Sequence, residues 1–512
     1  MPYTLHDFFS DAGVRDAIPF AKFIEIDLRD GEGNLCKPRP DQIVGLNKCI
    51  KFDRYGLYDD PGCGKTVISQ AYALFHIAQG NKCVVVMPPI LLYQFQESFK
   101  STFIGSDKYI RVHVLDEGPA GREQLFNAWD ASSSWPEVLC LSYQMFYKLY
   151  QTIGSKGYDV LITDEGHVLA NPESGIWKRI ESYLGKVGER ALLLMTGTPI
   201  KNELTDAYGL IELITPGVYS SYTQFERRHC VFTKIRLKNP IQGANGKKIT
   251  QIYKLTGYQN VKELQDNLYR QARRVTKDQV MKLPEPTLIT LPIRLSSQHH
   301  ALYSRLAKER IIEIGNEVIT ALQEQKLRQA MLQIITDPLT YMPEGSKMDN
   351  QVFQACWQIL DTVNVKKNKV IFFANYKASC RALAKEFAEF NPAIINGDSA
   401  DPEKEKKKFL TDDTCRLLIA NPESAGVGLN LQHVCYNAVF VEPTGVPGSF
   451  KQACERIFRG GQIHRVNIWV LKVLATLSPT AIDNMLRKEG AIQSVNRDSK
   501  SLMAELMGQK AA

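Results

Sequence analysis

Short apolar runs recur along the chain, with segments of helical periodicity between them. In residues 36–222, runs rich in valine, leucine and isoleucine occupy 82–87, 138–142, 160–163 and 191–196. Continuous apolar runs of this length are typical of strands that are buried on both faces of a parallel sheet. The pattern predicts a doubly wound α/β domain whose ligands bind at the carboxyl ends of the strands.

The same pattern returns in residues 366–476, with runs at 369–373, 393–396, 416–420, 438–441 and 467–472. It predicts a second domain of the same kind. The region between them, 223–365, has a different texture: a basic β-hairpin at 233–255 with a glycine-rich turn, then helical periodicity at 261–280 and 298–333. An N-terminal segment, 1–35, and a helical tail, 477–512, complete the organisation. The fold class is therefore expected to be α/β with two parallel sheets.

Composition restricts the class of protein without identifying it. Hydrophobic residues make up 44% and charged residues 23% of the chain, and no run reaches the ~18 apolar residues of a membrane-spanning helix. The first twenty residues lack the order of charges and apolar residues found in a signal peptide, so a cytoplasmic protein without a membrane partner is expected. The eleven cysteines include no C-x-x-C pair, which argues against a disulfide framework or a zinc site.

A glycine-rich turn, Gly62-Cys-Gly64-Lys65-Thr66, precedes an apolar helical segment. Glycines let backbone N–H groups wrap a phosphate, the lysine neutralises phosphate charge, and the threonine can ligate Mg²⁺. Only the second half of the Walker A pattern is matched, because Asp59 stands where a glycine is expected. The alternative is a plain turn before a core helix.

Two adjacent carboxylates, Asp164 and Glu165, follow the apolar run at 160–163. In this position Asp164 can bind Mg²⁺ and Glu165 can orient or deprotonate the attacking water. His167 is expected to couple this site to the loop Thr196-Gly197-Thr198. A solvated turn is the alternative, and the phosphate loop upstream argues against it.

Two arginines, Arg456 and Arg459, are three positions apart and are expected on one face of a helix in the second domain. Phosphoryl transfer is accelerated ~10³-fold or more by an arginine that reaches the transferred phosphate. In isolation such a pair would be read as a surface salt-bridging pair.

These segments occur in the order G-x-G-K-T, D-E-G-H, T-G-T-P, S-x-G-x-G-L-N-L from Ser424, and Q-A-x-x-R-x-x-R-x-G-Q from Gln452. The order resembles the Swi/Snf-like group of superfamily 2 helicases. Three further segments support the resemblance: R-P-x-Q from Arg39, R-R-x-K-D followed by L-P from Arg273, and S-K-M-D from Ser346. The resemblance covers residues 38–472.

The resemblance implies two RecA-like domains, with helical Swi/Snf-type insertions and the basic hairpin between them, that use ATP and Mg²⁺. It implies catalytic roles for Lys65, Asp164, Glu165, Arg456 and Arg459, and Mg²⁺ ligation by Thr66 and Asp164. The ATP-binding residues would be Arg39, Gln42, Gly62, Gly64, Lys65, Thr66, Gly428 and Gln452. Contacts with the DNA backbone would come from Pro88, Ser142, Tyr143, Ser424 and Asn430.

One segment departs from the group's pattern. Where the group has Asp-x-x-Trp-Asn-Pro, this chain has Glu442-Pro-Thr-Gly-Val-Pro447. The tryptophan and asparagine are lost, so the coupling between nucleotide and DNA is a point at which this chain can differ from the group.

The leading hypothesis is a monomeric DNA translocase or helicase that remodels branched or protein-bound duplex by branch migration, fork regression, unwinding or displacement of protein. The chain resembles compact annealing and branch-migration helicases, some of them phage-encoded. Lys247 and Lys248 of the hairpin are expected to contact a junction, although edge lysines can equally serve to prevent strand pairing. Three alternatives stay open: an RNA helicase, the motor subunit of a restriction or defence complex, and a non-hydrolysing nucleic-acid-binding scaffold.

Overall fold

The computed structural model describes residues 3–14, 26–30, 34–242, 248–313, 321–423 and 429–496. The chain forms two compact units. The first contains Met1–Arg228 and Asn260–Lys282, and the second contains His229–Gln259 and Leu283–Ala512. The chain therefore passes from one unit to the other after Arg228, after Gln259 and after Lys282. None of the helices in the described part of the chain has the length and hydropathy to span a lipid bilayer.

The first unit is built on a parallel sheet of seven strands in the order β3-β4-β2-β5-β6-β1-β9. Its strands are β1 (Arg54–Leu57), β2 (Lys82–Met87), β3 (Val112–Val114), β4 (Val138–Ser142), β5 (Tyr158–Thr163), β6 (Ala191–Met195) and β9 (Ala272–Arg273). The apolar runs predicted β2 and β4 to the residue and β5 and β6 within two residues. The three shortest strands of the sheet, β1, β3 and β9, were not predicted.

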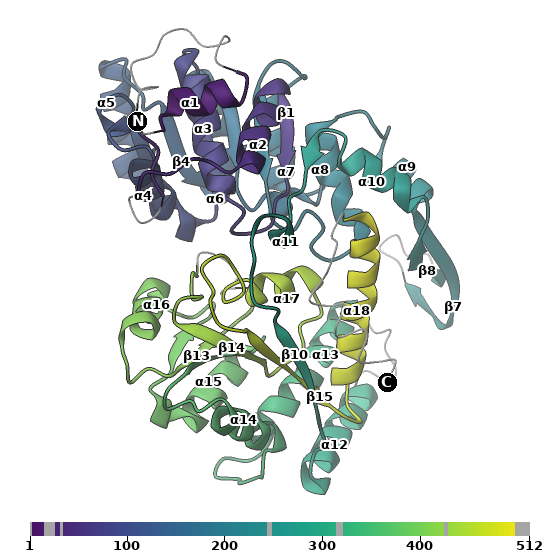
Figure 1. Ribbon diagram of the computed structural model, residues 1–512. Helices are drawn as coiled ribbons and strands as arrows, with labels where there is room; N and C mark the ends of the chain where they lie inside the picture. The colour runs from purple at the N-terminus through teal and green to yellow at the C-terminus, as the bar shows by residue number, and fades with distance from the viewer. Residues whose placement is uncertain are drawn as a thin grey trace. The chain divides into compact units, whose positions relative to one another are not determined.

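Helices cover both faces of this sheet (Figure 1). The helices of the first unit are α1 (Leu5–Asp11), α2 (Pro40–Lys51), α3 (Lys65–Ala78), α4 (Leu92–Thr102), α5 (Pro119–Ala131), α6 (Tyr143–Ser155), α7 (Gly175–Leu184), α8 (Ala207–Ile214), α9 (Tyr222–His229), α10 (Val261–Leu268) and α11 (Lys277–Val280). Helix α3 is buried from Ile68 to Phe75, because it packs against the sheet and against α2. Its first residue, Lys65, is thereby held at the carboxyl edge of the sheet.

The second unit is built on a sheet of six strands in the order β10-β15-β14-β11-β13-β12. Its strands are β10 (Thr287–Ile293), β11 (Lys369–Phe373), β12 (Ala393–Ile395), β13 (Leu417–Ala420), β14 (Cys435–Phe440) and β15 (Asn467–Val473). Every recorded pairing in this sheet is parallel. The prediction of two parallel α/β sheets is confirmed. Strand β10, which pairs with β15 over seven residues, comes from the region predicted as an insertion.

The second unit also contains α12 (Ser297–Glu313), α13 (Ala321–Thr336), α14 (Gln351–Thr362), α15 (Lys377–Glu386), α16 (Pro402–Thr411), α17 (Pro447–Cys454) and α18 (Ser478–Val495). Helix α18, which lies in the segment expected to be a helical tail, packs against β15 and α17. Residues 497–512 of that tail lie outside the described residues. The hairpin is present as β7 (Cys230–Gln242) and β8 (Lys248–Tyr258), paired antiparallel.

One expectation for the region between the sheets differs from the structure. The helix expected over 261–280 is broken, because α10 ends at Leu268 and the chain then forms β9 and α11. Strand β9 pairs with β1, and this pairing prevails over helical periodicity. The periodicity over 298–333 corresponds to α12 and α13, and residues 314–320 lie outside the described part.

Candidate nucleotide site

The phosphate loop connects β1 to α3 in the first unit. Gly62 and Gly64 have φ angles of 86° and 82°, which favour glycine. A Cβ atom on Gly64 would lie 2.1 Å from Nε2 of Gln42. Both the positive φ angle and this close contact therefore exclude a side chain at position 64. Lys65 begins α3, and its Nζ donates to the Asp59 carbonyl at 2.6 Å. The loop's own backbone therefore holds the lysine.

Asp59, which departs from the Walker A pattern, is completely buried and bonded to a distant segment. Arg273 donates to its carboxylate through Nε at 3.1 Å and also through Nη2, and the Val275 N–H donates at 2.9 Å. Burial raises the pKa of Asp59, and the Arg273 charge opposes that rise. The next residue, Asp60, forms a similar ion pair with Arg274, whose Nη2 lies 2.9 Å from Asp60 Oδ1. Two buried ion pairs thus fasten the R-R-x-K-D segment to the start of the phosphate loop.

The R-P-x-Q segment lies at the start of α2 and contacts the same loop. The Gln42 side-chain oxygen accepts the Arg39 N–H at 2.8 Å, and Arg39 donates to the Cys63 carbonyl at 2.6 Å. Arg273 Nη1 donates to the Asp41 carbonyl. Arg39 and Gln42 are therefore beside the phosphate loop, and their contact with ATP stays a prediction.

The two adjacent carboxylates lie directly after β5. Burial and the Glu165 charge raise the pKa of Asp164 to about 6, and the Lys65 charge opposes this rise. Glu165 has a left-handed backbone with φ of 52°, and its N–H donates to Asp164 Oδ1 at 2.9 Å. A non-glycine residue in this conformation is strained, and such strain gathers at functional sites. The turn places the two acids next to each other at the sheet edge.

His167 joins this turn to the T-G-T-P loop. Its Nδ1 lies 3.2 Å from Glu165 Oε2 and 3.4 Å from Thr196 Oγ1. Thr196 Oγ1 also accepts the Thr198 N–H at 3.1 Å. The contacts expected from the sequence are present, and their role in coupling stays a prediction.

The T-G-T-P loop also packs on the phosphate loop. A Cβ atom on Gly197 would lie 2.6 Å from Pro61 Cδ, so a larger residue at this position would push the two loops apart.

A magnesium ion fits the donors that this site offers. The Thr66 hydroxyl and the Asp164 carboxylate are oxygen ligands of the kind that Mg²⁺ prefers. The raised pKa of Asp164 reflects burial next to a second negative charge. A cation at this position would therefore stabilise both carboxylates in their ionised form.

Three residues predicted to contact DNA, Pro88, Ser142 and Tyr143, lie at the carboxyl ends of strands of the first sheet. Pro88 comes directly after β2, and Ser142 ends β4. Ser142 Oγ accepts the Met145 N–H at 3.1 Å and so caps α6. The Tyr143 hydroxyl donates to the Asp164 carbonyl at 2.8 Å, a link that the sequence did not predict. A side chain next to the expected DNA path is thereby bonded to the carboxylate turn.

Arg456 and Arg459 belong to the second unit and do not lie on a helix, contrary to expectation. Helix α17 ends at Cys454, and the Arg456 N–H donates to the Ala453 carbonyl in a tighter turn. The Arg456 carbonyl accepts the Leu431 N–H in place of a helical partner. The Nε of Arg456 donates to the Gln452 carbonyl at 2.9 Å.

The second arginine is bonded to a residue predicted to contact DNA. Arg459 Nη1 donates to Asn430 Oδ1. Burial and the neighbouring Arg456 charge lower the pKa of Arg459 to about 10. The Glu455 charge opposes this shift. Arg456 is buried and Arg459 is half-buried, and two neighbouring cations of this kind are suited to an anionic ligand. Ser424 and Gly428, which belong to the same loop as Asn430, lie outside the described residues.

Of the two hairpin lysines predicted to contact DNA, Lys247 also lies outside the described residues, and Lys248 is the first residue of β8.

Glu442, at the point of departure from the group's pattern, is buried in the second unit. Its carboxylate accepts the Asn375 N–H at 2.7 Å and the Ser379 hydroxyl at 2.5 Å. Burial raises its pKa to about 7. The side chain fixes the turn between β11 and α15.

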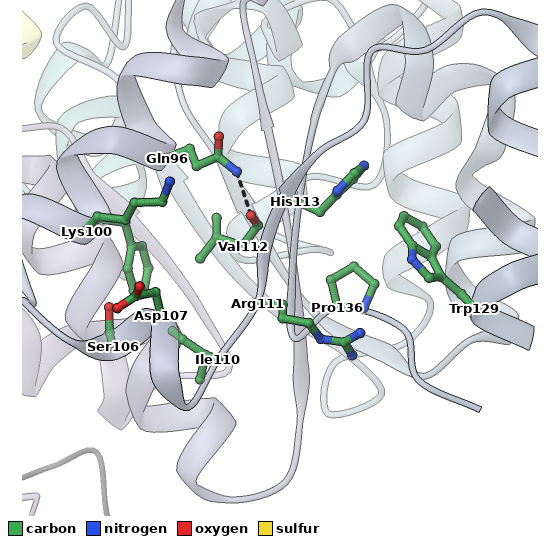
Figure 2. A pocket seen from close by; sticks show the side chains of 11 residues that line it. Gln96, Lys100, Ser106, Asp107, Ile110, Arg111, Val112, His113, Trp129 and Pro136 are labelled. Carbon is green, nitrogen blue, oxygen red and sulfur yellow. Dashed lines mark hydrogen bonds between the residues drawn. The ribbon is translucent and has the colours of Figure 1, made fainter. Parts of the chain in front are cut away.

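Two pockets are lined by residues other than those predicted for the site. Figure 2 shows one of about 300 Å³ beside the edge strand β3, where Gln96 donates to the Val112 carbonyl at 2.6 Å. None of the residues predicted for the site lines it. A larger pocket of about 870 Å³ lies in the second unit, between turns that follow β11, β13 and β14 and residues of α13, α18 and the hairpin.

The chain is similar to one protein family and to several known proteins. The sequence profile of the SNF2-related domain matches residues 53–351, more than half of the chain. The chain is 23% identical to the DNA repair and recombination protein RAD54B of Mus musculus, over 90% of this chain and 56% of that protein. It is 21% identical to the uncharacterised ATP-dependent helicase YqhH of Bacillus subtilis, over 92% of this chain and 81% of that protein.

Another relative is also longer than this chain, and one solved structure shares the fold. The SWI/SNF-related matrix-associated actin-dependent regulator of chromatin subfamily A-like protein 1 of Xenopus tropicalis is 24% identical to this chain. The alignment covers 90% of this chain and 45% of that protein. The chain thus spans about half the length of this protein and of RAD54B. The Pyrococcus furiosus Hef helicase domain aligns over 86% of this chain and 97% of its own, with a TM-score of 0.50 and 13% identity. The SWI2/SNF2 ATPase core of Sulfolobus solfataricus in complex with dsDNA aligns over 93% and 100%, with a TM-score of 0.38 and 16% identity.

Proposed function

This chain belongs to the SNF2-related domain family of ATP-dependent helicases and translocases, and we propose on that basis that it hydrolyses ATP to move along DNA and remodel it. The observation that carries the proposal is the phosphate loop, whose two left-handed glycines and Lys65 stand beside the turn of Asp164 and Glu165. A glycine-rich turn without a nucleotide would not need two adjacent, half-buried acids next to a lysine.

In the proposed reaction each residue of the first unit has a separate task. Lys65 exchanges the Asp59 carbonyl for the β- and γ-phosphates of ATP, and Gly62 and Gly64 let the backbone approach them. Thr66 and Asp164 hold Mg²⁺, which neutralises charge on the transferred phosphate. Glu165 orients the attacking water, and its left-handed backbone fixes where its carboxylate points.

The second unit supplies positive charge in the proposed reaction. Arg456 and Arg459 stabilise the charge that develops on the γ-phosphate. Arg459 is bonded to Asn430, so a DNA strand that contacts Asn430 would alter an arginine of the ATP site. Arg39, Gln42, Gly428 and Gln452 complete the proposed nucleotide contacts.

The proposed substrate is duplex or branched DNA, bound through its backbone by Pro88, Ser142, Tyr143, Ser424 and Asn430, and at the hairpin by Lys247 and Lys248. Backbone contacts predict binding that weakens steeply with salt. The link from Tyr143 to the Asp164 carbonyl offers a path from this surface to hydrolysis. The names of the RAD54B relatives, which refer to DNA repair and recombination, favour branched DNA.

The test is the rate of ATP hydrolysis with blunt duplex, single-stranded DNA, a four-way junction and structured RNA. We expect DNA to stimulate hydrolysis, with the junction most effective. Lys65→Ala should abolish hydrolysis without unfolding the chain, whereas Lys178→Ala, which removes an exposed lysine paired with Glu173, should not.

Other outcomes would point elsewhere. Stimulation by RNA alone would identify an RNA helicase. Stimulation that appears only with a partner nuclease would identify the motor of a restriction or defence complex. Binding of DNA without hydrolysis under any condition would identify a scaffold and refute the proposal.

A further inference from the structure

The two faces of the β7–β8 hairpin differ in chemistry. Directly paired residues of an antiparallel ribbon point to the same side, and successive residues alternate. The pairing assigns to one face, the Tyr253 face, the pairs Phe232 with Leu255, Lys234 with Tyr253, and Arg236 with Gln251. The opposite face carries the pairs Thr233 with Lys254 and Ile235 with Ile252.

Tyr253 is exposed and has cations around it. Its side chain is 64% exposed, and that of Phe232 is 41% exposed. Lys234 lies directly across from Tyr253, where Cβ atoms are about 4.5–5.5 Å apart. Arg236 and Phe232 are its diagonal neighbours on the other strand, and Lys234 and Arg236 are exposed as well. An exposed aromatic ring thus has two cations beside it, both on the neighbouring strand β7.

Exposed apolar residues on both faces are unusual for a ribbon of two strands. Such a hairpin has little stability of its own in water, and large apolar side chains left in solvent gain nothing from burial. Ile235 and Ile252 on the opposite face are 37% and 40% exposed. A ligand that covers the Tyr253 face would therefore stabilise the hairpin.

The combination of an exposed aromatic ring and flanking cations matches one kind of ligand. Aromatic side chains stack on nucleic-acid bases, whatever the sequence, and lysine and arginine contact the adjoining phosphates. In a duplex both faces of each internal base are covered by its neighbours. A stacking platform therefore selects bases that are unpaired.

We propose that the Tyr253 face binds an unpaired segment of a DNA strand, with a base stacked on Tyr253 and the adjoining phosphates bound by Lys234 and Arg236. The proposal rests on the proposed function and narrows its substrate to DNA that is branched or partly single-stranded. It gives the hairpin a role that differs from backbone contact along a duplex.

The test compares DNA binding by full-length variants on the two faces. Fluorescence anisotropy is measured with a labelled single strand, a forked duplex and a blunt duplex at one salt concentration. Tyr253→Ala should weaken binding to the single strand and the fork roughly tenfold, with a smaller loss on the blunt duplex. Tyr253→Phe, which keeps the ring, and Ile252→Ala, a matched apolar truncation on the opposite face, should bind all three within about twofold of the parent chain.

A direct signal comes from Tyr253→Trp, whose emission should be quenched by the single strand and not by the blunt duplex. Equal losses on all three DNAs for Tyr253→Ala, or an equal effect of Ile252→Ala, would overturn the proposal. Unchanged binding by Tyr253→Ala while DNA still stimulates ATP hydrolysis would overturn this inference and leave the proposed function standing. Absence of stimulation in the parent chain would instead refute the proposed function.

Discussion

The start of the phosphate loop in the first unit and the site residues of the second unit bury charge in different ways. In the first, each buried acid that precedes the phosphate loop has an arginine partner: Asp59 has Arg273, and Asp60 has Arg274. In the second, Glu442 is bonded by neutral donors, and burial together with the neighbouring Arg456 charge lowers the pKa of Arg459. The first unit therefore fixes the shape of its loop without a ligand. In the second unit, the free energy of keeping Arg459 and Glu442 charged depends on the ligand that binds and on the pH.

The largest expected effect comes from the arginines of the second unit. Arg456→Ala should lower kcat for DNA-stimulated ATP hydrolysis ~10³-fold or more, because the transition-state charge loses its partner, while the KM for ATP changes much less. Arg381→Ala, which removes an exposed arginine paired with Asp398, is the matched control and should retain the parent rate. A kcat for Arg456→Ala within tenfold of the parent would contradict the assigned role.

The ion pairs of the first unit predict a large loss of stability instead. Arg273→Ala leaves the buried Asp59 carboxylate without its cation and should lower the free energy of unfolding by roughly 3–5 kcal/mol. Arg228→Ala, which breaks an exposed pair with Glu263, should cost about 0–1 kcal/mol. Urea unfolding measures both. Replacing Asp59 and Arg273 together should recover part of the loss of stability. Equal losses for Arg273→Ala and Arg228→Ala would show that burial of the ion pair does not matter.

The smallest effect concerns Glu442 and depends on pH. Its pKa in the folded chain is about 7, against an ordinary value of 4.5, so the folded state holds this proton more tightly than the unfolded state does. Its contribution to stability is complete below about pH 4.5 and is lost as the pH rises through 7, by roughly 2–4 kcal/mol. Glu442→Gln should remove this part of the pH dependence, which unfolding at pH 5 and pH 8 would reveal. Identical slopes for the two chains would contradict it.

The sequence was most informative where a local pattern decides the structure. Strands β2, β4 and β11 are buried on both faces and read as continuous apolar runs, so they were predicted to the residue. The family expected from the motifs is confirmed by the match over residues 53–351. Lys65 and Asp164 could be proposed as site residues because phosphate loops and acidic turns are local motifs.

What the sequence could not give depends on contacts between distant residues. Strand β1 contains an arginine and a glycine in four residues, and β9 is two residues long, so neither has a pattern of its own. The break in the helix expected over 261–280 follows from the partners of Arg273 and Arg274, more than 200 positions away. One signal was available: an acid at position 59, where a glycine was expected, implies a buried cation nearby.

The links within the site were hidden for the same reason. The bond from Tyr143 to the Asp164 carbonyl and the bond from Arg459 to Asn430 each join two separate motifs. Each motif could be recognised alone, but its partner is chosen by the packing of strands and turns. The end of α17 before Arg456 likewise follows from a backbone bond to Leu431.

Strand β10 has a consequence for how such proteins can exchange parts. It occupies the edge of the second sheet beside β15, although it precedes the motifs of that unit by many residues. A hybrid of two relatives joined at position 366 would take β10 from one parent and β15 from the other. The side chains that meet between these two strands would then come from proteins in which they had not evolved together. A join after Lys282 keeps both strands from the same parent, so productive recombination between relatives should favour that site.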